Sequence, residues 1–173
     1  MRGKNVFLRK LRLRDEYDVY RNVNDWQVVK FLTRIPWPYK RKDATDFIRK
    51  TFLGRRRGTS YTFGICFNGA DKVIGIIDIF NVDLTHRKAE VGYWLGRKNW
   101  GKGVMSEALE LISSFAFDEL KLHRLEAKVY GGNKASCRVL ERNGFIKEGF
   151  LREAIYKWAK FHNIYVYGKL RLK

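Results

Sequence analysis

The stretch AEVGYWLGRKNWGKGVMSEALELISSFAFDEL, residues 89–120, decides the fold of this chain. Residues 90–95 have the composition of a β-strand, which ends at Gly96. After the loop RKNWGKG, apolar side chains recur at helical spacing from Val104 to Ala116. The stretch therefore predicts a strand, a glycine-containing loop and a helix that begins near Gly103.

The loop before this helix predicts an anion site. Gly101 and Gly103 lack a Cβ, so they permit tight turns and let backbone N–H groups approach a ligand closely. The first turn of a helix adds unpaired N–H groups and the positive end of the helix dipole. We therefore expect a phosphate or pyrophosphate here, and the alternative is a loop that needs its glycines only to turn. The basic residues that flank the site are Arg97, Lys98 and Lys102.

Two phosphate-binding patterns compete for this loop. Residues 96–102 almost complete GxxxxGK[ST], but Gly103 replaces the hydroxyl residue that holds magnesium in that pattern. The other pattern, [QR]-x-x-G-x-[GA], belongs to acyl-coenzyme A loops. Residues 98–103 match it, except that Lys98 replaces Gln or Arg. The loop alone leaves both alternatives open.

A second motif lies downstream of the loop. The segment NKASCRVLERNGFIKEGFLRE, residues 133–153, contains the pattern N-x-x-S-x-x-V-L-E-x-x-G-F-x-x-E-G-x-x-R. Together with EVGYWL and WGKGVMSEAL, it resembles the GNAT superfamily of N-acetyltransferases. Within that superfamily, the chain is similar to the RimJ/RimL-like branch of ribosomal-protein N-acetyltransferases. The resemblance extends over nearly the whole chain.

The rest of the chain predicts a mixed α/β fold. We expect helices at residues 16–25, 43–57, 104–120 and 134–143, and strands at residues 5–12, 59–67, 73–80, 89–95, 124–130, 145–158 and 164–172. Short connections predict antiparallel pairing of residues 59–95, whereas a helical crossover makes residues 124–130 parallel to residues 90–95. The resemblance implies one N-acetyltransferase domain over residues 1–173. It also implies a GNAT-like, mostly antiparallel sheet with two splayed parallel strands and helices on both faces.

Local signals add some details. Asp15 and Asp43 are expected to cap the first two helices, and Phe52 to face the core from the second. Pro36 and Pro38 exclude regular structure between these helices.

The resemblance implies that acetyl-CoA is the acetyl donor and lies in the gap between the two splayed strands. Strand residues would line the pantetheine arm, the loop and the helix start would hold the pyrophosphate, and the 133–138 segment would close the other side. The implied cofactor-binding residues are Tyr93, Trp94, Leu95, Arg97, Lys98, Trp100, Gly101, Lys102, Gly103, Val104, Met105, Ser106, Asn133, Ser136 and Arg138. No metal is expected, because the Cys and His residues show no metal-ligand spacing.

Acetyl transfer to an amine requires a neutral amine, a polarised thioester carbonyl and a proton for the leaving thiolate. Glu90 is the predicted base. It is an acidic residue in an otherwise apolar strand, and it shares a face with Gly92 and Trp94. The alternative is a structural glutamate that pairs with Arg87 or Lys88.

Resemblance to the ribosomal branch makes Ser136 the proton donor for the thiolate, and the alternative is an ordinary helix-start serine. The chain departs from the family at two other positions. Many GNAT enzymes carry Tyr where Leu140 stands, and the ribosomal branch can use a Glu where Ile155 stands. These departures favour Glu90 as the base. With no nucleophilic triad in the sequence, we expect direct attack on the thioester.

Composition limits the partners. Lys and Arg number 36 against 18 Asp and Glu, for a net charge of +18. Such an excess attracts nucleic acid and repels polyamines, although solubility alone also explains it.

No apolar run reaches membrane-spanning length, and no signal-peptide core follows the basic start. We expect a cytoplasmic protein without a membrane partner.

The predicted function is an acetyl-CoA-dependent N-acetyltransferase for a primary amine of a protein or peptide. The resemblance to the ribosomal branch implies the N-terminal α-amine of a ribosomal protein as the leading acceptor. An α-amine also loses its proton more readily than lysine, so a modest base suffices. By resemblance, Trp37 and Tyr39 border the acceptor pocket, and the alternative is that they pin a proline-rich loop to the core. A small-molecule amine acceptor and a basic RNA- or ribosome-binding module without turnover also stay open, as does the choice between monomer and homodimer.

Overall fold

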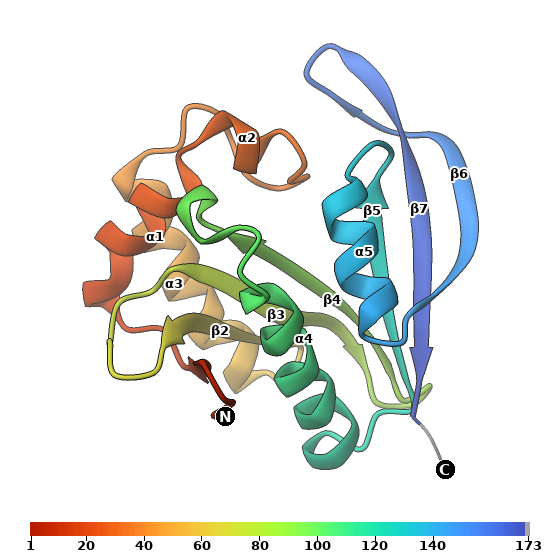
Figure 1. Ribbon diagram of the computed structural model, residues 1–173, viewed down its shortest axis with the longest axis horizontal. Coiled ribbons are helices and arrows are strands. Elements are labelled where there is room, and N and C mark those ends of the chain that lie inside the picture. Colours follow the sequence, from red (N-terminus) through yellow and green to blue (C-terminus); the bar gives the residue numbers. More distant parts are fainter. Residues whose placement is uncertain (172–173) are drawn as a thin grey trace.

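A seven-stranded sheet organises the protein, and the computed structural model describes residues 1–171 of it (Figure 1). The strand order is β1-β2-β3-β4-β5-β7-β6, and every neighbouring pair is antiparallel except β4 and β5. The predicted mixed, mostly antiparallel sheet is confirmed. The strands are β1 (Val6–Arg9), β2 (Ser60–Phe67), β3 (Gly75–Asp83), β4 (Lys88–Leu95), β5 (Arg124–Tyr130), β6 (Ile146–Lys157) and β7 (Lys160–Leu170).

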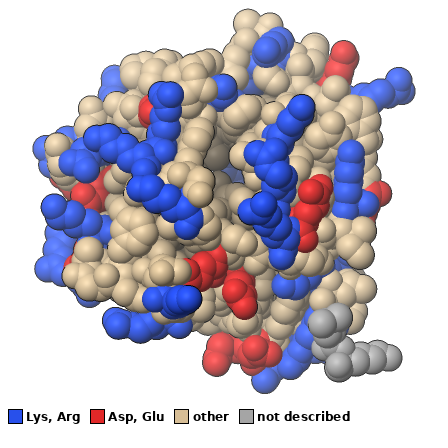
Figure 2. Space-filling model, viewed as in Figure 1, with Lys and Arg blue, Asp and Glu red and all other residues tan. Residues whose placement is uncertain are grey.

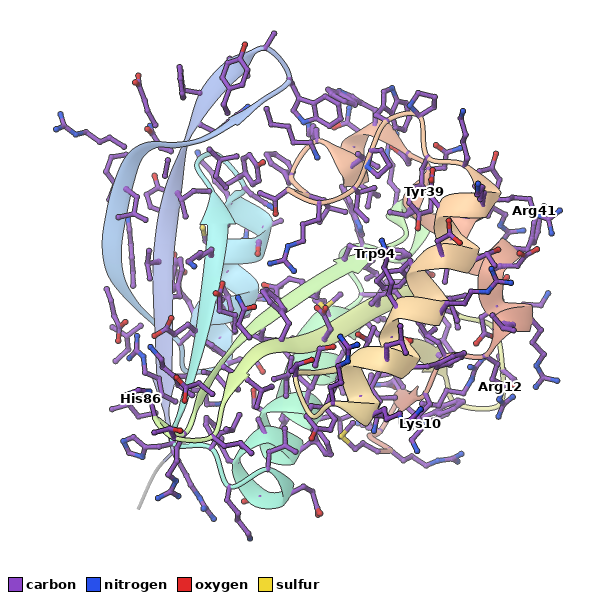
Figure 3. All side chains as sticks on the ribbon, turned by 180° about the vertical axis from the view of Figure 1, so that it is seen from behind. Lys10, Arg12, Tyr39, Arg41, His86 and Trp94 are labelled. Carbon is purple, nitrogen blue, oxygen red and sulfur yellow. The ribbon has the colours of Figure 1, made fainter. Side chains whose placement is uncertain are left out.

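Helices cover both faces of this sheet (Figures 1 and 3). The described α-helices are α1 (Glu16–Val23), α2 (Trp26–Val29), α3 (Arg41–Arg56), α4 (Val104–Ser114) and α5 (Lys134–Arg142). Three short turns accompany them: η1 (Leu13–Asp15), η2 (Arg97–Asn99) and η3 (Phe115–Glu119), the last of which extends α4. The helices α1, α2 and α3 lie on one face, and α4 lies on the other with α5 beside it.

Two apolar cores hold these layers together. Successive strand residues point to opposite faces, so Ile77 and Ile79 pack against α4 whereas Ile76 packs against α1 and α3. The buried stripe of α4 includes Leu109 and Ile112, both fully buried. Burying each such side chain contributes roughly 1.5–3 kcal/mol, so both layers fix the sheet firmly.

The parallel strands β4 and β5 are paired only near their starts. The register joins Lys88–Glu90 of β4 to Arg124–Glu126 of β5, and no further rung follows although β4 continues to Leu95 and β5 to Tyr130. Beyond Glu90, β4 keeps its pairing with β3, and β5 keeps its pairing with β7. The sheet therefore opens into a gap, as Figure 1 shows, and the predicted splayed pair is confirmed.

Some local predictions were wrong. The helix α2 was not expected, although Asp25 caps it by accepting a 2.8 Å hydrogen bond from the backbone of Gln27. Strand β7 begins at Lys160, four residues before the predicted start, because Trp158 and Ala159 make a turn with positive φ. The predicted end of this strand, Leu172, lies outside the described residues.

Three side-chain predictions for the first two predicted helices also need correction, those for Phe52, Asp43 and Asp15. Phe52 is 44% exposed, because the inward stripe of α3 runs through Ala44, Ile48 and Thr51 instead. Helix α3 begins at Arg41, so Asp43 lies in its first turn and accepts a hydrogen bond from the backbone of Lys40.

Asp15 is not a side-chain cap of α1 but the centre of a buried ion pair. Its carboxylate accepts hydrogen bonds from Nη1 and Nη2 of Arg9, at 2.7 and 2.8 Å, and from the backbone N–H of Arg12, at 2.7 Å. The side chains of Arg9 and Asp15 are only 10% and 4% exposed. This pair ties β1 to the turn that leads into α1.

We expect Asp15→Ala to lower the free energy of unfolding by about 3 kcal/mol, because it leaves Arg9 buried without this counter-charge. Urea unfolding followed by circular dichroism would measure the change. Arg14→Ala is the matched control, since the Arg14 side chain is 68% exposed and its ion pair with Asp71 lies at the surface. That variant should lose less than about 1 kcal/mol. Equal losses in both variants would contradict the assignment.

Candidate active site

A cavity of about 1490 Å³ passes through the gap between β4 and β5. Its lining comes from both faces of the sheet: Phe47 and Lys50 belong to α3, whereas Ser106 starts α4 and Arg138 lies on α5. Figure 2 shows the hollow near the middle of the face that carries α4 and α5, with Lys and Arg on both sides of it. Groups held on opposite faces of the sheet can therefore meet inside it.

The loop that enters α4 forms one wall of this cavity. Gly101 and Gly103 have φ of 76° and 74°, a left-handed conformation that favours glycine. A Cβ built at either position would meet no atom within 4 Å, so the space beside both is open. The indole Nε1 of Trp100 donates a 2.7 Å hydrogen bond to the carbonyl of Leu95 and fixes the loop against the end of β4.

The first turn of α4 faces basic side chains from α5. Its residues Val104, Met105 and Ser106 line the cavity, and Ser106 Oγ accepts a 2.8 Å hydrogen bond from Nδ2 of Asn143 at the end of α5. Unpaired first-turn N–H groups and the helix dipole favour an anion at such a terminus. The basic residues that the glycine loop and α5 contribute to the lining are Lys102, Arg138 and Arg142.

Tyr93 and Ser136 bridge from β4 to α5. The Tyr93 hydroxyl lies 2.9 Å from Ser136 Oγ and donates to the Ser136 carbonyl at 3.3 Å. Asn133 caps α5 by accepting a hydrogen bond from the Ser136 backbone, so the Ser136 hydroxyl is not needed as the cap. Burial raises the pKa of Tyr93 above its ordinary value, against a smaller opposing effect of the Ser136 hydrogen bond. The phenol therefore stays protonated at neutral pH and can supply a proton.

Glu90 occupies the last rung that joins β4 to β5. Its Oε1 accepts a 2.8 Å hydrogen bond from Nδ2 of Asn81, and its Oε2 lies 3.2 Å from Nζ of Lys128. The carboxylate lines the cavity with its side chain 16% exposed. Its partners, Asn81 and Lys128, thus differ from Arg87 and Lys88, which the sequence suggested as the structural alternative.

Of the two residues predicted to border the acceptor, Tyr39 lines the cavity and Trp37 does not. Tyr39 is buried, lines the cavity and lies on the α3 side of the sheet with Trp94 (Figure 3). Trp37 is 41% exposed, is absent from the lining, and packs edge-on against Trp26 with ring centroids 5.7 Å apart. The structure thus brings Tyr39, and not Trp37, to the cavity.

The tip of the β6–β7 hairpin holds the loop beside this acceptor side. The Lys157 Nζ donates hydrogen bonds to the carbonyls of Leu32, Thr33 and Ile35, three residues that line the cavity. We call this set of contacts the Lys157 clasp. Burial lowers the pKa of Lys157, and the three carbonyl acceptors offset the desolvation of its charge.

Most of the predicted cofactor residues come together in this one cavity. Arg97 and Lys98 are outside its lining: Arg97 lies 3.8 Å from the carboxylate of Asp25, and Lys98 is exposed. The predicted residues that do line it are Tyr93, Trp94, Leu95, Trp100, Gly101, Lys102, Gly103, Val104, Met105, Ser106, Asn133, Ser136 and Arg138.

Comparison with known proteins identifies the family. Residues 5–146 match the family described as "Acetyltransferase (GNAT) domain". The chain belongs to the GNAT superfamily. It is 36% identical to the uncharacterized N-acetyltransferase p20 of Bacillus licheniformis, over 97% of this chain and 94% of that protein. It is 30% identical to the ribosomal-protein-serine acetyltransferase of Escherichia coli, over 78% of this chain and 75% of that protein.

A solved structure gives the same result for the fold. Mycobacterium smegmatis RimJ, in complex with a CoA-disulfide, is 25% identical and superposes with a TM-score of 0.87, over 95% of this chain and 81% of that one. This chain is therefore an N-acetyltransferase of the RimJ/RimL-like branch, as predicted from its motifs.

Within residues 1–171, no cluster of His, Cys, Asp and Glu could hold a metal ion, and no helix is long and apolar enough to span a membrane.

Two of the positions where this acetyltransferase departs from the family pattern, 140 and 155, carry apolar side chains. Leu140 is fully buried in the core between α5 and the sheet, and Ile155 lines the cavity from β6. Neither can donate or accept a proton, which leaves acid–base chemistry to other side chains of the GNAT cavity.

Asp78 is an acidic cavity residue that the sequence predictions missed. It lies on β3, where its register partners are Thr62 on β2 and Gly92 on β4. Burial raises its pKa to about 7, while the nearby Arg34 guanidinium acts in the opposite direction. One signal was present in the sequence: Asp78 is a charged residue inside the apolar run VIGIIDIF.

The raised pKa of Asp78 predicts a pH-dependent stability. A carboxyl with a folded-state pKa of about 7 and an ordinary value of 3.8 favours folding fully below pH 3.8, and this contribution is lost as the pH rises to 7. We therefore expect Asp78→Asn to be more stable than the wild type at pH 8, by at most about 4 kcal/mol, with little difference near pH 4. Thermal unfolding across this range would test it. A stability difference that does not vary with pH would contradict the prediction.

Proposed function

We propose that this acetyltransferase transfers the acetyl group of acetyl-CoA to the N-terminal α-amine of a protein. The observation that carries the proposal is a single cavity that joins a phosphate-type loop on one face of the sheet to carboxylates on the other. A ribosomal protein is the first acceptor to test, because the Escherichia coli relative is named for a ribosomal-protein substrate. Such an activity would operate in the cytoplasm, where both substrates occur.

The coenzyme proposal rests on the fit of the loop. Gly101 and Gly103 leave open space beside the first turn of α4, and Lys102, Arg138 and Arg142 supply positive charge around it. When bound, acetyl-CoA supplies an activated thioester. Beyond Glu90, the backbone groups of β4 that point away from β3 have no strand partner, so they are free to hold an extended ligand in the gap.

The catalytic groups follow from the geometry around that gap. Glu90, at the last rung, is proposed to accept a proton from the amine directly or through a water molecule. The hydroxyl pair of Tyr93 and Ser136, 2.9 Å apart, is proposed to protonate the departing thiolate. Tyr93 extends the prediction from sequence, which gave this role to Ser136 alone.

The proposed function is tested by the choice of acceptor. We expect thiol release from acetyl-CoA with peptides that match ribosomal-protein N-termini, and at least about tenfold lower kcat/KM with aminoglycosides or spermine. The net charge of +18 opposes the approach of polycations. Faster turnover of an aminoglycoside would favour the small-molecule alternative. Coenzyme binding without turnover on any acceptor would favour the RNA- or ribosome-binding module.

The loop assignment predicts a specific loss of coenzyme affinity. We expect Gly103→Ala to raise the Kd for acetyl-CoA at least about tenfold, because it strains the left-handed turn and adds a methyl group beside the proposed pyrophosphate site. Isothermal titration calorimetry would measure the Kd.

Gly69→Ala is the matched control for this variant. Gly69 also has a positive φ, 82°, and open space beside it, but it lies in the turn after β2 and outside the cavity lining. The control should bind acetyl-CoA like the wild type. An unchanged Kd in Gly103→Ala would refute the loop assignment.

A further inference from the structure

Asp78 is the cavity carboxylate to which the proposed reaction assigns no role. No hydrogen bond joins its carboxylate to another residue within positions 1–171, and neither oxygen is a buried atom left without a partner, so both are open to the cavity. Glu90, in contrast, has Asn81 on one oxygen and Lys128 on the other. The Asp78 carboxylate is therefore accessible to a ligand that brings a hydrogen-bond donor.

The neighbouring backbone allows Asp78 to reach toward the gap. Asp78 and Gly92 are direct register partners on adjacent strands, so both lie on the α3 face. A Cβ on Gly92 would stand only 3.1 Å from Asp78 Oδ1 and 3.0 Å from the Phe80 ring. The bare backbone of Gly92 therefore leaves room for this carboxylate to extend over β4.

The two cavity carboxylates form a diagonal pair on this face. Glu90 precedes Gly92 by two residues on β4, which puts its Cα about 7 Å from that of Asp78 in a regular antiparallel pair. Arg34, from the loop after α2, stacks over the Phe80 ring at 4.8 Å and is the basic group that acts on Asp78. Asp46 and Lys50 of α3 and Lys128 of β5 are further charged residues of the lining.

We propose that Asp78 binds the acceptor ammonium group and takes its first proton. This inference rests on the proposed function and adds to it the group that recognises the acceptor. Asp78 would then be a catalytic residue, since it contacts the reacting nitrogen.

The proton balance of this step is complete. The ammonium gives one proton to the Asp78 carboxylate and becomes a neutral amine. The amine nitrogen then bonds to the acetyl carbon, and the carbon–sulfur bond breaks. The nitrogen gives a second proton to Glu90, and the thiolate receives a proton from the Tyr93–Ser136 pair. Water restores the hydroxyl proton and removes the protons from both carboxyls, so one proton is released for each turnover.

The proton affinities of the two groups suit this transfer. Burial holds the pKa of Asp78 at about 7, close to the value near 8 of an α-amine. Proton transfer from an α-amine to Asp78 is therefore unfavourable by only about tenfold. Any preference for α-amines over lysine comes from the lower pKa of the α-amine itself and does not depend on which base accepts the proton.

Four proteins test the proposal: the wild type, Asp78→Asn, Glu90→Gln and the surface control Asp118→Asn. The Asp118 side chain is 65% exposed, and its ion pair with Arg171 is long, at 3.6 Å. For each protein we would measure acetyl-CoA affinity by calorimetry. Thiol release would give kcat and kcat/KM from pH 5.5 to 9, with one peptide that has a free α-amine and an N-terminally blocked peptide that contains lysine.

We expect wild-type kcat/KM for the α-amine peptide to fall about tenfold per unit below pH 7. Asp78→Asn should lower kcat/KM at pH 7.5 by about 10²–10³-fold and remove that acidic limb, with acetyl-CoA affinity unchanged. Glu90→Gln should lower kcat but keep the limb near pH 7. Asp118→Asn should behave like the wild type.

The outcomes separate this proposal from the function on which it rests. Asp78→Asn with wild-type kcat/KM and an intact acidic limb would overturn the role of Asp78 and leave the acetyltransferase function standing. A wild-type protein that binds acetyl-CoA but prefers the lysine peptide would contradict the proposed α-amine acceptor. A wild-type protein that does not bind acetyl-CoA would instead contradict the proposed function itself.

Discussion

The early separation of β4 from β5 is the constraint on which the rest of the structure depends. Each strand is fully paired on its outer side, β4 with β3 and β5 with β7, so the sheet can divide without losing either strand. Three rungs hold the two parts together at one end. The backbone N–H and C=O groups that face the gap have no strand partner. Such groups are tolerated only where a ligand or water can form hydrogen bonds with them.

The two layers of helices make this division stable. Helix α4 shares one core with residues of both β4 and β5, whereas α1 and α3 pack on the opposite face against the part of the sheet that contains β4. The same arrangement aims different chemistry at the gap from each side. The start of α4 provides backbone N–H groups and nearby positive charge, whereas the opposite face provides Glu90 and Asp78. The sheet thereby separates the end of the cavity beside the glycine loop from the end that contains Glu90 and Asp78.

Local sequence patterns predicted this framework well because its decisive parts are contiguous. Strand β4, the glycine loop and α4 follow one another within residues 88–114, and each has a strong composition or periodicity of its own. The parallel pairing of β5 followed from the helix between the strands. The position of Glu90 on the cavity face followed from strand alternation alone.

What the sequence did not reveal depends on contacts between distant residues or on weak local signals. Helix α2 spans only four residues and has no periodicity to detect, and the turn before β7 uses Trp158 and Ala159 rather than glycine or asparagine. The role proposed for Asp78 depends on its register with Gly92, fourteen positions away in sequence, and on burial by other elements. The pairing of the Tyr93 phenol with Ser136 likewise requires α5 to be placed over the gap.

The Lys157 clasp has a further consequence for the shape of the opening. In Figure 1, β4 and β5 diverge toward α2 and the tip of the β6–β7 hairpin, which is where Lys157 holds the carbonyls of residues 32, 33 and 35. The opening is therefore bounded at both ends. The paired residues of β4 and β5 close one end, and the Lys157 clasp closes the other. In the proposed reaction, acetyl-CoA and the acceptor would enter this opening from opposite faces of the sheet, so each product would have its own exit.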